Sequence, residues 1–390
     1  MRVTHVITRL IVGGAQENTI ATVLGLRQKP GVEVRLITGP TAGPEGSLED
    51  YFTRTPELLT RLPELVRPVH PWKDLLAWRQ LTRHFRQQHP DLVHTHSGKA
   101  GVLGRLAAAR AGVPVIVHTI HGPSFGSFQG ALANAAFRAA ERRAARVTTH
   151  FVTVADAMTR QYLAAGIGQP GQYTRVFSGF ELQPFLGARN DLRLRDRWGL
   201  RPDDIVIGKI ARLFKLKGHD DLFRVARHLV TISAQIKFLL VGDGEWRSRF
   251  EGLARVLGLE KHFIFTGLVP PAEIPPLVGM MDLVVHLSRR EGLPRALPQA
   301  LAAARPVVAY DCDGAREVCF DNVTGFLVPP GDLAGLSARL AGLAGNAQMR
   351  TQFGQRGQAF VREHFSVGHM VDRLYTLYVK LASDCGKQHP

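Results

Sequence analysis

Two cations follow the first apolar segment of the second half of the chain. In the stretch GKIARLFKLKGHDDL, Arg212 comes shortly after the apolar residues 205–210, and Lys217 lies five residues further on. A guanidinium and an ammonium on one loop can bind a diphosphate, and they can stabilise the negative charge of a departing nucleotide. A solvated basic loop has the same composition, so this stretch alone does not identify a site.

An acidic residue stands just before a predicted helix in the stretch SRREGLPRALPQALA. Residues 282–287 have the pattern of a strand, and Pro294 suits the first turn of the helix that follows. The free N–H groups at such a helix start favour a phosphate by about 0.3–1 kcal/mol at an exposed site. The carboxylate of Glu291 can accept hydrogen bonds from sugar hydroxyls, and the alternative role is that of a helix-capping acid.

Two motifs in the first half of the chain are weaker evidence for a binding site. Gly13-Gly14 lies between a predicted strand and a predicted helix, where paired glycines let the backbone approach a phosphate or a sugar. A tight turn needs the same residues. His121 follows the apolar segment 115–120, and it can bind a sugar hydroxyl or shuttle a proton, although a lone histidine is more often structural.

Two groups of residues raise the question of a metal ion. The histidines concerned are His94, His96, His118 and His121. No cysteine or carboxylate completes that set into a usual zinc site, so zinc is a poor interpretation. Asp311 and Asp313 resemble a carboxylate pair, but their position after an apolar segment suits a turn equally well. We therefore predict no metal site.

These residues are positioned by short apolar segments that alternate with helix-length patterns. The strand-length segments are RVTHVIT, EVRLIT, DLVHTH, PVIVHTI and HFVTVA in a first series, and DIVIGKIA, IKFLLVG, HFIFTG, DLVVHLS, RPVVAYD and GFLVPP in a second. Residues 71–89 and 98–111 are predicted helices of the first series. The alternation predicts an α/β fold with parallel sheets, in which ligands bind beyond the carboxyl ends of the strands.

The two series predict two Rossmann-like domains. The expected boundaries are 1–184 for an amino-terminal domain, 185–202 for a linker, 203–366 for a carboxyl-terminal domain and 367–390 for a closing helix. The linker is rich in charge and is punctuated by glycine and proline. The closing segment has apolar residues near one face of a helix.

Composition limits the partners and the location. The chain has 390 residues, with 49 Lys and Arg against 33 Asp and Glu, and a net charge of +16. A basic surface attracts nucleic acid, anionic lipid headgroups or a phosphorylated substrate, but no nucleic-acid-binding module is recognisable. No apolar run approaches the roughly 18 residues that span a bilayer. We expect a cytoplasmic protein, with peripheral contact with the anionic inner face of the cell membrane as a further expectation.

Taken in order, the motifs resemble one family. The chain resembles the retaining glycosyltransferases of the large GT-B-fold group known as family 4. The matching motifs are Gly13-Gly14, DLVHTHSGKAGVLGR, His121, Arg212 with Lys217-Gly218, LLVGDG, FTGLV, Glu291-Gly292 and GAREVCFDNVTGFLVPPGD. They span nearly the whole chain. The resemblance implies the GT-B fold, with two Rossmann-like domains facing across a cleft and the last helix crossing back to the first domain.

The resemblance also implies a nucleotide-sugar donor, with 203–366 as the nucleotide-sugar-binding domain and 1–184 as the acceptor domain. It assigns Arg212 and Lys217 to the diphosphate, Glu291 to the donor sugar, and His121 to the region of the sugar and the acceptor. The further donor-binding residues that it implies are Gly13, Gly14, Leu268, Val269, Leu293, Arg295, Ala296 and Gln299. Enzymes of this kind usually need no metal, and the nucleotide-sugar is a co-substrate, so we expect no cofactor.

The chain departs from the family pattern at two places. The family usually has a second Glu eight positions after the first, which binds the nucleotide ribose, and Gln299 stands here instead. Its amide oxygen still accepts a hydrogen bond, so the expected loss is about 1 kcal/mol. The family's Asn-Gly loop before the linker is Ser178-Gly179 in this chain.

The expected function is transfer of a sugar, with UDP-sugar as the first choice of donor, to a lipid-linked or polysaccharide acceptor with retention at the anomeric carbon. Two alternatives remain at this point. A nucleotide-sugar epimerase of related fold would convert the donor with no acceptor present. A non-catalytic nucleotide-sugar-binding protein, which Gln299 suggests, would bind the donor without turnover.

Overall fold

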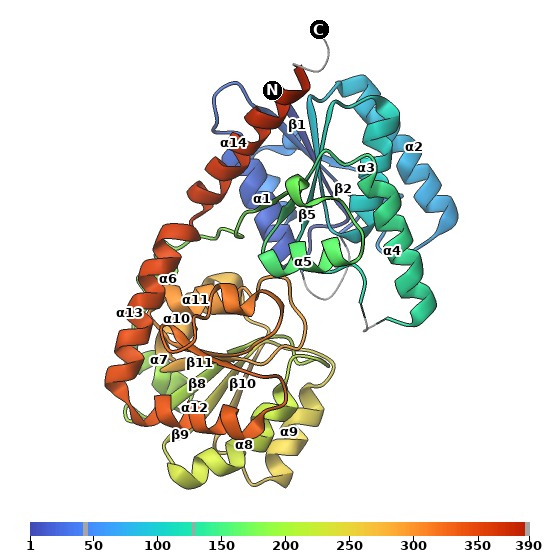
Figure 1. Cartoon of the computed structure of the whole chain (residues 1–390). Coiled ribbons are helices and arrows are strands. Elements are labelled where there is room, and N and C mark those ends of the chain that lie inside the picture. Colours follow the sequence, from blue (N-terminus) through green and yellow to red (C-terminus); the bar gives the residue numbers. More distant parts are fainter. Residues whose placement is uncertain (42–45, 127–128, 387–390) are drawn as a thin grey trace. The chain divides into compact units, whose positions relative to one another are not determined.

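The structure is a computed structural model that describes residues 1–41, 46–126 and 129–386. The chain divides into two compact units. Unit 1 comprises Met1–Phe180 together with the described residues from Val367 onward, and unit 2 comprises Glu181–Ser366. Each unit contains one parallel sheet with helices packed against it, so the predicted α/β fold with two Rossmann-like domains is confirmed (Figure 1).

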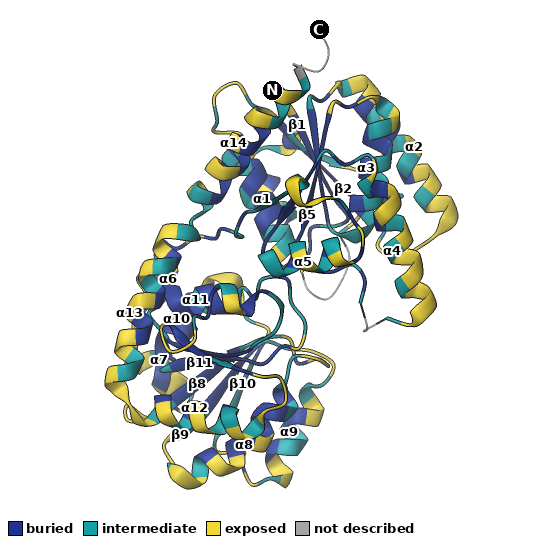
Figure 2. Cartoon of the chain, in the orientation of Figure 1, coloured by how far each residue is buried: buried dark blue, intermediate teal, exposed yellow. Residues whose placement is uncertain are grey.

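Unit 1 is built on a seven-stranded sheet of order β3-β2-β1-β4-β5-β6-β7, in which all neighbouring strands are parallel. Its strands are β1 (Arg2–Ile7), β2 (Glu33–Thr38), β3 (Leu59–Arg61), β4 (Leu92–His96), β5 (Val115–Ile120), β6 (His150–Thr153) and β7 (Tyr173–Arg175). Its helices are α1 (Gly14–Leu26), α2 (Pro71–Gln88), α3 (Gly98–Ala111), α4 (Ala131–Ala145), α5 (Asp156–Ala164) and α14 (Val367–Gly386). The central strands β1, β4 and β5 are buried almost throughout, which explains their continuous apolar segments (Figure 2).

Two apolar layers hold the helices of unit 1 against its sheet. Helices α1 and α14 share one core cluster, in which Val23 and Leu374 are buried with residues of the sheet. Helices α2 and α3 share the other, through residues such as Leu81 and Ala107. The last helix of the chain therefore packs on the unit that contains the first strand, as the fold-class prediction expects.

Unit 2 is built on a six-stranded parallel sheet of order β10-β9-β8-β11-β12-β13. Its strands are β8 (Ile205–Ile210), β9 (Ile236–Val241), β10 (Phe263–Gly267), β11 (Leu283–His286), β12 (Val307–Tyr310) and β13 (Gly325–Val328). Its helices are α6 (Gln183–Leu186), α7 (Leu192–Arg197), α8 (His219–Ile232), α9 (Arg247–Val256), α10 (Ile274–Met280), α11 (Ala296–Ala302), α12 (Leu333–Gly345) and α13 (Ala347–His364). The main apolar core lies between the sheet and helices α8, α9 and α12.

Residues 185–202, which the sequence suggests as a linker, include part of α6 and all of α7 and pack on unit 2. Arg195 holds this segment in place, because its side chain is only 2% exposed. Its guanidinium donates to the backbone oxygen of Met280 at 2.9 Å and to Oδ2 of Asp282 at 3.0 Å. It also donates to three carbonyl oxygens of the segment that leads into β8, including that of Asp204 at 2.9 Å.

Candidate functional site

The loops that follow β8 and β11 meet at the carboxyl edge of the unit 2 sheet, because these two strands are neighbours. The N–H of Arg289 donates to the carbonyl oxygen of Leu216 at 2.9 Å. Gly218, at φ +70°, fits closely beside the second loop: a Cβ there would lie 2.2 Å from the carbonyl oxygen of Leu287. Only glycine combines this backbone angle with this close approach, so the contact explains why a glycine follows Lys217 in the sequence.

The two loops bring Lys217 and Glu291 together, although they are 74 positions apart in the chain. The ammonium of Lys217 donates to Oε1 of Glu291, and both side chains are mostly buried, with 20% and 24% exposed. His286 approaches the same oxygen at 3.8 Å. Burial alone would raise the pKa of Glu291, but the Lys217 ammonium holds it below its ordinary value. The carboxylate is therefore ionised and can accept hydrogen bonds from hydroxyl groups.

The two aspartates that resemble a metal-binding pair have different partners. Asp313 accepts a hydrogen bond from the backbone N–H of Glu291 at 2.7 Å, and so joins the loop after β12 to the loop after β11. Asp311 instead pairs with the guanidinium of Arg316, whose Nε lies 2.8 Å from Oδ1. Asp313 thus has a structural role beside Glu291, and Asp311 is the ion-pair partner of Arg316.

Arg212 and the residues after Glu291 lie on the same edge of the sheet. Arg212 is exposed, and its guanidinium lies 5.6 Å from the ring centroid of Phe214. Helix α11 begins at Ala296, two residues after Pro294, and a backbone hydrogen bond of 3.2 Å from the N–H of Leu297 to the carbonyl oxygen of Pro294 closes the turn that leads into it. The predicted donor contacts Leu293 and Arg295 precede the helix and are partly exposed, and Ala296 is buried.

The residues predicted to contact the nucleoside are also on unit 2. Gln299 is on α11 and is partly exposed, eight residues after Glu291. Leu268 and Val269 directly follow β10, the edge strand of the sheet, and Leu268 is 66% exposed. An apolar side chain that is this exposed at the carboxyl end of a parallel strand is available to a planar base.

Two of the predicted donor-binding residues, Gly13 and Gly14, lie on unit 1. Gly14 is the first residue of α1, and Gly13 precedes it in an extended conformation at φ 172°. A Cβ on Gly13 would meet only the flexible side chain of Gln16, at 2.8 Å from Oε1. The local fold therefore does not itself demand glycine at position 13, which leaves room for a role in ligand approach.

His121 lies at the end of β5 and is the outermost ring of a chain of three imidazoles. Its Nε2 is 3.0 Å from Nδ1 of His96, and Nε2 of His96 is 2.9 Å from Nδ1 of His5. Burial lowers the pKa of His121 to about 4 and that of His5 to about 3. The rings are therefore neutral at physiological pH, and each of the two bonds needs one N–H and one lone pair.

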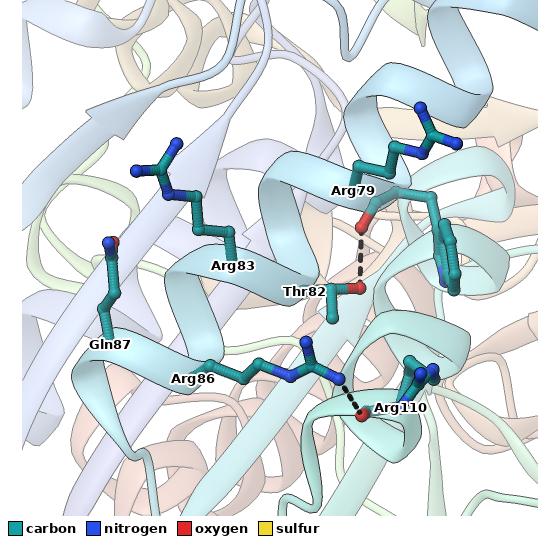
Figure 3. Close-up of a pocket in the computed structure, with 7 residues that line it drawn as sticks. Arg79, Thr82, Arg83, Arg86, Gln87 and Arg110 are labelled. Carbon is teal, nitrogen blue, oxygen red and sulfur yellow. Dashed lines mark hydrogen bonds between the residues drawn. The ribbon is translucent and has the colours of Figure 1, made fainter.

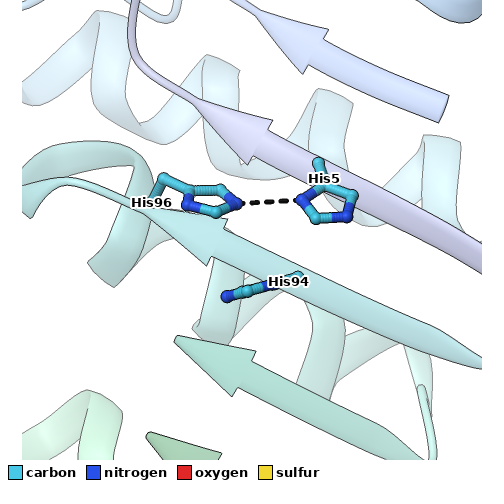
Figure 4. A group of neighbouring side chains, drawn as sticks. All are labelled: His5, His94 and His96. Atoms are coloured by element: carbon cyan, nitrogen blue, oxygen red, sulfur yellow. Dashed lines mark hydrogen bonds between the residues drawn. The ribbon is translucent and has the colours of Figure 1, made fainter. Parts of the chain in front are cut away.

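Three histidines on β1 and β4 lie on one face of the sheet of unit 1. Ring nitrogens of His5, His94 and His96 lie within 4.8 Å of one another (Figure 4). His5 pairs with His94 in the register of β1 and β4, and His96 is two residues further along β4. Both ring nitrogens of His94 are occupied, by the hydroxyls of Thr119 at 2.6 Å and Tyr378. Both nitrogens of His96 are occupied as well, whereas Nε2 of His5 is buried and has no hydrogen-bond partner among the described residues.

A basic groove of about 280 Å³ lies on unit 1, between α2 and the end of α3 (Figure 3). It is lined by Trp78, Arg79, Thr82, Arg83, Arg86, Gln87 and Arg110. These lining residues include four arginines and no carboxylate. Arg86 donates to the carbonyl oxygen of Arg110 at 3.3 Å. Trp72, which is 74% exposed, and Leu76, which is 44% exposed, extend the same helix with apolar surface.

Sequence reasoning misses two residues near these sites. His5 completes the imidazole chain, but only the register of β1 against β4 places it there. Lys209 is the second, a lysine that is 1% exposed within β8. Its signal is present in the sequence, because a lysine interrupts the apolar segment DIVIGKIA.

Two family models match the chain. The model described as "Glycosyl transferase 4-like domain" matches residues 13–177, and the model described as "Glycosyl transferases group 1" matches residues 190–360. Together they cover most of both units.

Among curated proteins, the chain is 25% identical over 340 residues to the UDP-Gal:alpha-D-GlcNAc-diphosphoundecaprenol alpha-1,3-galactosyltransferase of Escherichia coli, covering 86% of this chain and 87% of that protein. It is 28% identical over 319 residues to the putative glycosyltransferase EpsD of Bacillus subtilis (strain 168), covering 80% and 82%. Among solved structures, Anabaena Alr3699/HepE in complex with UDP matches with a TM-score of 0.81 at 22% identity, covering 97% of this chain and 100% of that one. Within the described part of the chain, no helix has the length and apolar character to cross a membrane.

Proposed function

The chain belongs to the group 1 glycosyltransferases of GT-B fold, and from this premise we propose the reaction that it catalyses. A sugar moves from a nucleotide-sugar donor, UDP-sugar as the first choice, to a hydroxyl of a lipid-linked or polysaccharide acceptor, with retention at the anomeric carbon. The pathway is the synthesis of a bacterial surface glycan. The observation that carries this proposal is the Lys217–Glu291 pair at the carboxyl edge of the unit 2 sheet.

The donor is bound by the residues around that pair. Lys217 and Arg212 bind the diphosphate, and the ionised Glu291 accepts hydrogen bonds from hydroxyls of the donor sugar. Gln299 accepts a hydrogen bond from the ribose. The base lies beside Leu268 and Val269, and the backbone of residues 293–296 faces phosphate or sugar. Lys217 is bound to Glu291 in the structure, so binding of a diphosphate shares this ammonium between two acceptors.

The hard step is departure of the nucleoside diphosphate. The bond between the anomeric carbon and the phosphate oxygen breaks, and Lys217 and Arg212 stabilise the charge that develops on that oxygen. The acceptor oxygen attacks the same face of the sugar, and its proton passes to the leaving phosphate. No side-chain nucleophile takes part in this scheme. No metal ion takes part either, because two cationic side chains neutralise the charge of the leaving group.

Two features of unit 1 serve the acceptor and the donor sugar in this proposal. His121 provides a hydrogen bond to a sugar hydroxyl, and the Gly13-Gly14 backbone approaches a phosphate. The pKa of His121 is lowered by burial to about 4, which favours hydrogen bonding over proton uptake as its role near neutral pH.

The test of the function uses Lys217→Ala and Arg212→Ala, with Lys215→Ala as the matched control. Lys215 is an exposed lysine on the same loop, two residues before Lys217. Thermal-shift screening with UDP-, GDP- and ADP-sugars first identifies the donor. We expect each of the two active-site variants to lose about two orders of magnitude in turnover, the usual effect of removing one group that stabilises the transition-state charge.

The outcomes separate the alternatives. Near-normal turnover in both variants would remove these cations from the mechanism, and inversion of the anomeric configuration, seen by NMR of the product, would refute retention. Conversion of the donor with no acceptor present would indicate an epimerase. Donor binding without turnover across a broad panel of acceptors would indicate a non-catalytic binding protein.

We also propose that the arginine groove of Figure 3 contacts an anionic membrane surface. The groove supports this with four arginines, and the exposed Trp72 lies on the same helix α2, a combination suited to lipid headgroups and the interface below them. The E. coli relative, whose name specifies an undecaprenol diphosphate substrate, gives the proposal a biological setting.

Liposome flotation with anionic vesicles tests the membrane contact. The variant carries Arg79→Glu, Arg83→Glu and Arg86→Glu. The control makes the same charge change on unit 2, at the exposed residues Arg224, Arg227 and Arg255. We expect flotation of the wild type and of the control, and loss of flotation of the groove variant. Equal loss in both variants would mean that net charge, and not the groove, determines binding.

A further inference from the structure

Lys209 is a buried amine without a hydrogen-bond partner, and it interacts electrostatically with both Lys217 and Glu291. It lies near the carboxyl end of β8 and is 1% exposed, and Nζ has no partner among the described residues. A lysine ammonium requires up to three acceptors, and leaving it buried without them is costly. The ligand-free protein therefore provides no hydrogen-bond acceptor for a charged Lys209 among the described residues.

The charged and titratable groups that interact electrostatically with Lys209 lie on four segments of unit 2. They are Lys217 on the loop after β8, His219 and Asp221 on α8, His286 on β11 and Glu291 on the loop after β11. Burial, followed by the repulsion of Lys217, lowers the pKa of Lys209 from 10.5 to about 7. Burial also lowers the pKa of His286 to about 3 and that of His219 far below its usual range, so both rings are neutral.

The two nearby carboxylates do not neutralise Lys209, because each is committed to other donors. Glu291 accepts from Lys217. Oδ2 of Asp221 accepts from the guanidinium of Arg289 and from the hydroxyl of Tyr310, both at 2.8 Å. In the ligand-free protein at slightly alkaline pH, the amine of Lys209 is therefore mostly uncharged.

We propose that Lys209 takes up a proton from solvent when the diphosphate of a nucleotide-sugar binds at Lys217, so that donor binding is coupled to the charging of a buried lysine. The inference rests on the proposed function for the position of the diphosphate. Binding adds two negative charges beside Lys217 and removes part of the repulsion that keeps Lys209 neutral. Lys209 acts through the electrostatics of the site and does not itself touch the ligand.

The sign of the pH dependence follows from this coupling. Below pH 7 Lys209 already carries its proton in the free protein, and binding takes up none. Above pH 7 the proton must be acquired during binding, so donor affinity falls as pH rises, by at most about tenfold per pH unit. The decline ends where the pH passes the raised pKa of Lys209 in the complex.

Isothermal titration calorimetry with UDP-glucose measures the uptake directly. Its diphosphate is a diester with no ionisation near neutral pH, so the ligand itself contributes no proton. Titrations at pH 8 in two buffers of different ionisation enthalpy give the number of protons bound. We expect proton uptake by the wild type at pH 8, with an upper limit of about 0.9 proton set by the pKa of about 7 in the free protein, and almost none at pH 6.

Two variants complete the experiment. Lys209→Met removes the amine at similar volume, and it should bind UDP-glucose with no proton uptake at pH 8. Lys215→Met removes an exposed lysine of the neighbouring loop and should keep the uptake. Binding by the wild type without uptake, or uptake that persists in Lys209→Met, would overturn the proposal for Lys209 and leave the donor site standing. Failure of UDP-glucose and every other nucleotide-sugar to bind would refute the proposed function and this inference together.

If Lys209→Met does not fold, the wild-type curve alone decides. Proton uptake must appear between pH 6 and pH 8 as Lys209 loses its proton in the free protein. Uptake that is constant across this range would exclude Lys209 as its source.

Discussion

The charge state of Lys209 can be tested without any ligand, through the stability of unit 2. The perturbation is Lys209→Met, which keeps an unbranched side chain of similar length in the core and removes the amine. The amine is 1% exposed and unpartnered, so its replacement by an apolar group should stabilise the folded chain.

The magnitude follows from linkage. The pKa of Lys209 is about 7 in the folded protein and 10.5 for an ordinary lysine. Between these pH values the unfolded chain binds one more proton at this residue than the folded chain does. The unfolding free energy of the wild type therefore rises relative to that of the variant by about 1.4 kcal/mol per pH unit. From pH 7 to pH 9 the change is about 2–3 kcal/mol, and below pH 7 the advantage of the variant is largest and constant.

Hydrogen exchange is the suitable assay, because a chain of two units need not unfold in one step. Opening free energies of amides in β8 and β9 are compared between wild type and variant at pH 6, 7, 8 and 9. The other titrating groups are common to both proteins, and His219 and His286, which Lys209 influences, have pKa values lowered far below this pH range, so their contributions largely cancel in the difference. Lys237→Met on β9 is the control for the loss of a lysine from this sheet: the Lys237 ammonium donates to the carbonyl oxygen of Lys261 at 2.9 Å and is partly exposed. A flat difference for Lys209→Met would refute the argument, because it would mean that the amine keeps its proton when buried.

Three further predictions concern the site and its supports. Gln299→Glu should preserve UDP-sugar affinity or improve it by about fivefold in calorimetry, because an ionised acceptor strengthens the ribose hydrogen bond, and clear weakening would contradict the ribose assignment. Gly218→Ala should destabilise unit 2 by more than about 2 kcal/mol in hydrogen exchange, because its Cβ would meet a backbone oxygen at 2.2 Å, whereas Gly258→Ala, at a similar φ with open space around it, should cost only about 1–2 kcal/mol. Arg105→Met should destabilise unit 1 by about 3–5 kcal/mol in the same assay, because it leaves the buried carboxylate of Glu141 without the guanidinium that lies 2.6 Å away, and a loss below about 1 kcal/mol would show that water replaces the pair.

The secondary structure could be predicted where the local pattern is strong. The predicted helices 71–89 and 98–111 correspond to α2 (Pro71–Gln88) and α3 (Gly98–Ala111). The two edge strands β3 and β7 were not predicted, since each has only three residues, and pairing with a neighbouring strand determines their conformation. The same holds for α7, whose charged sequence suggests a linker until the burial of Arg195 on unit 2 is known.

The members of the donor site could be predicted individually, but not their contacts. Arg212, Lys217 and Glu291 each follow a strand, which places them at one edge of a parallel sheet. The pairing of Lys217 with Glu291 additionally requires that β8 and β11 be neighbours, and strand order is not written in any local pattern. The role of Asp313 was likewise missed, because its partner is a backbone N–H in another loop.

The two buried polar clusters argue for different roles because their hydrogen bonds are satisfied to different degrees. In unit 1, five of the six ring nitrogens of His5, His94 and His96 have hydrogen-bond partners, and Nε2 of His5 alone has none among the described residues, so hydrogen bonds explain most of this burial. In unit 2, the amine of Lys209 and both ring nitrogens of His219 are buried without partners among the described residues. Such groups cost stability in the ligand-free protein, and a fold retains them most readily where a ligand recovers the cost. The unsatisfied cluster lies behind Lys217 and Glu291, which is the place where the proposed diphosphate would supply the missing negative charge.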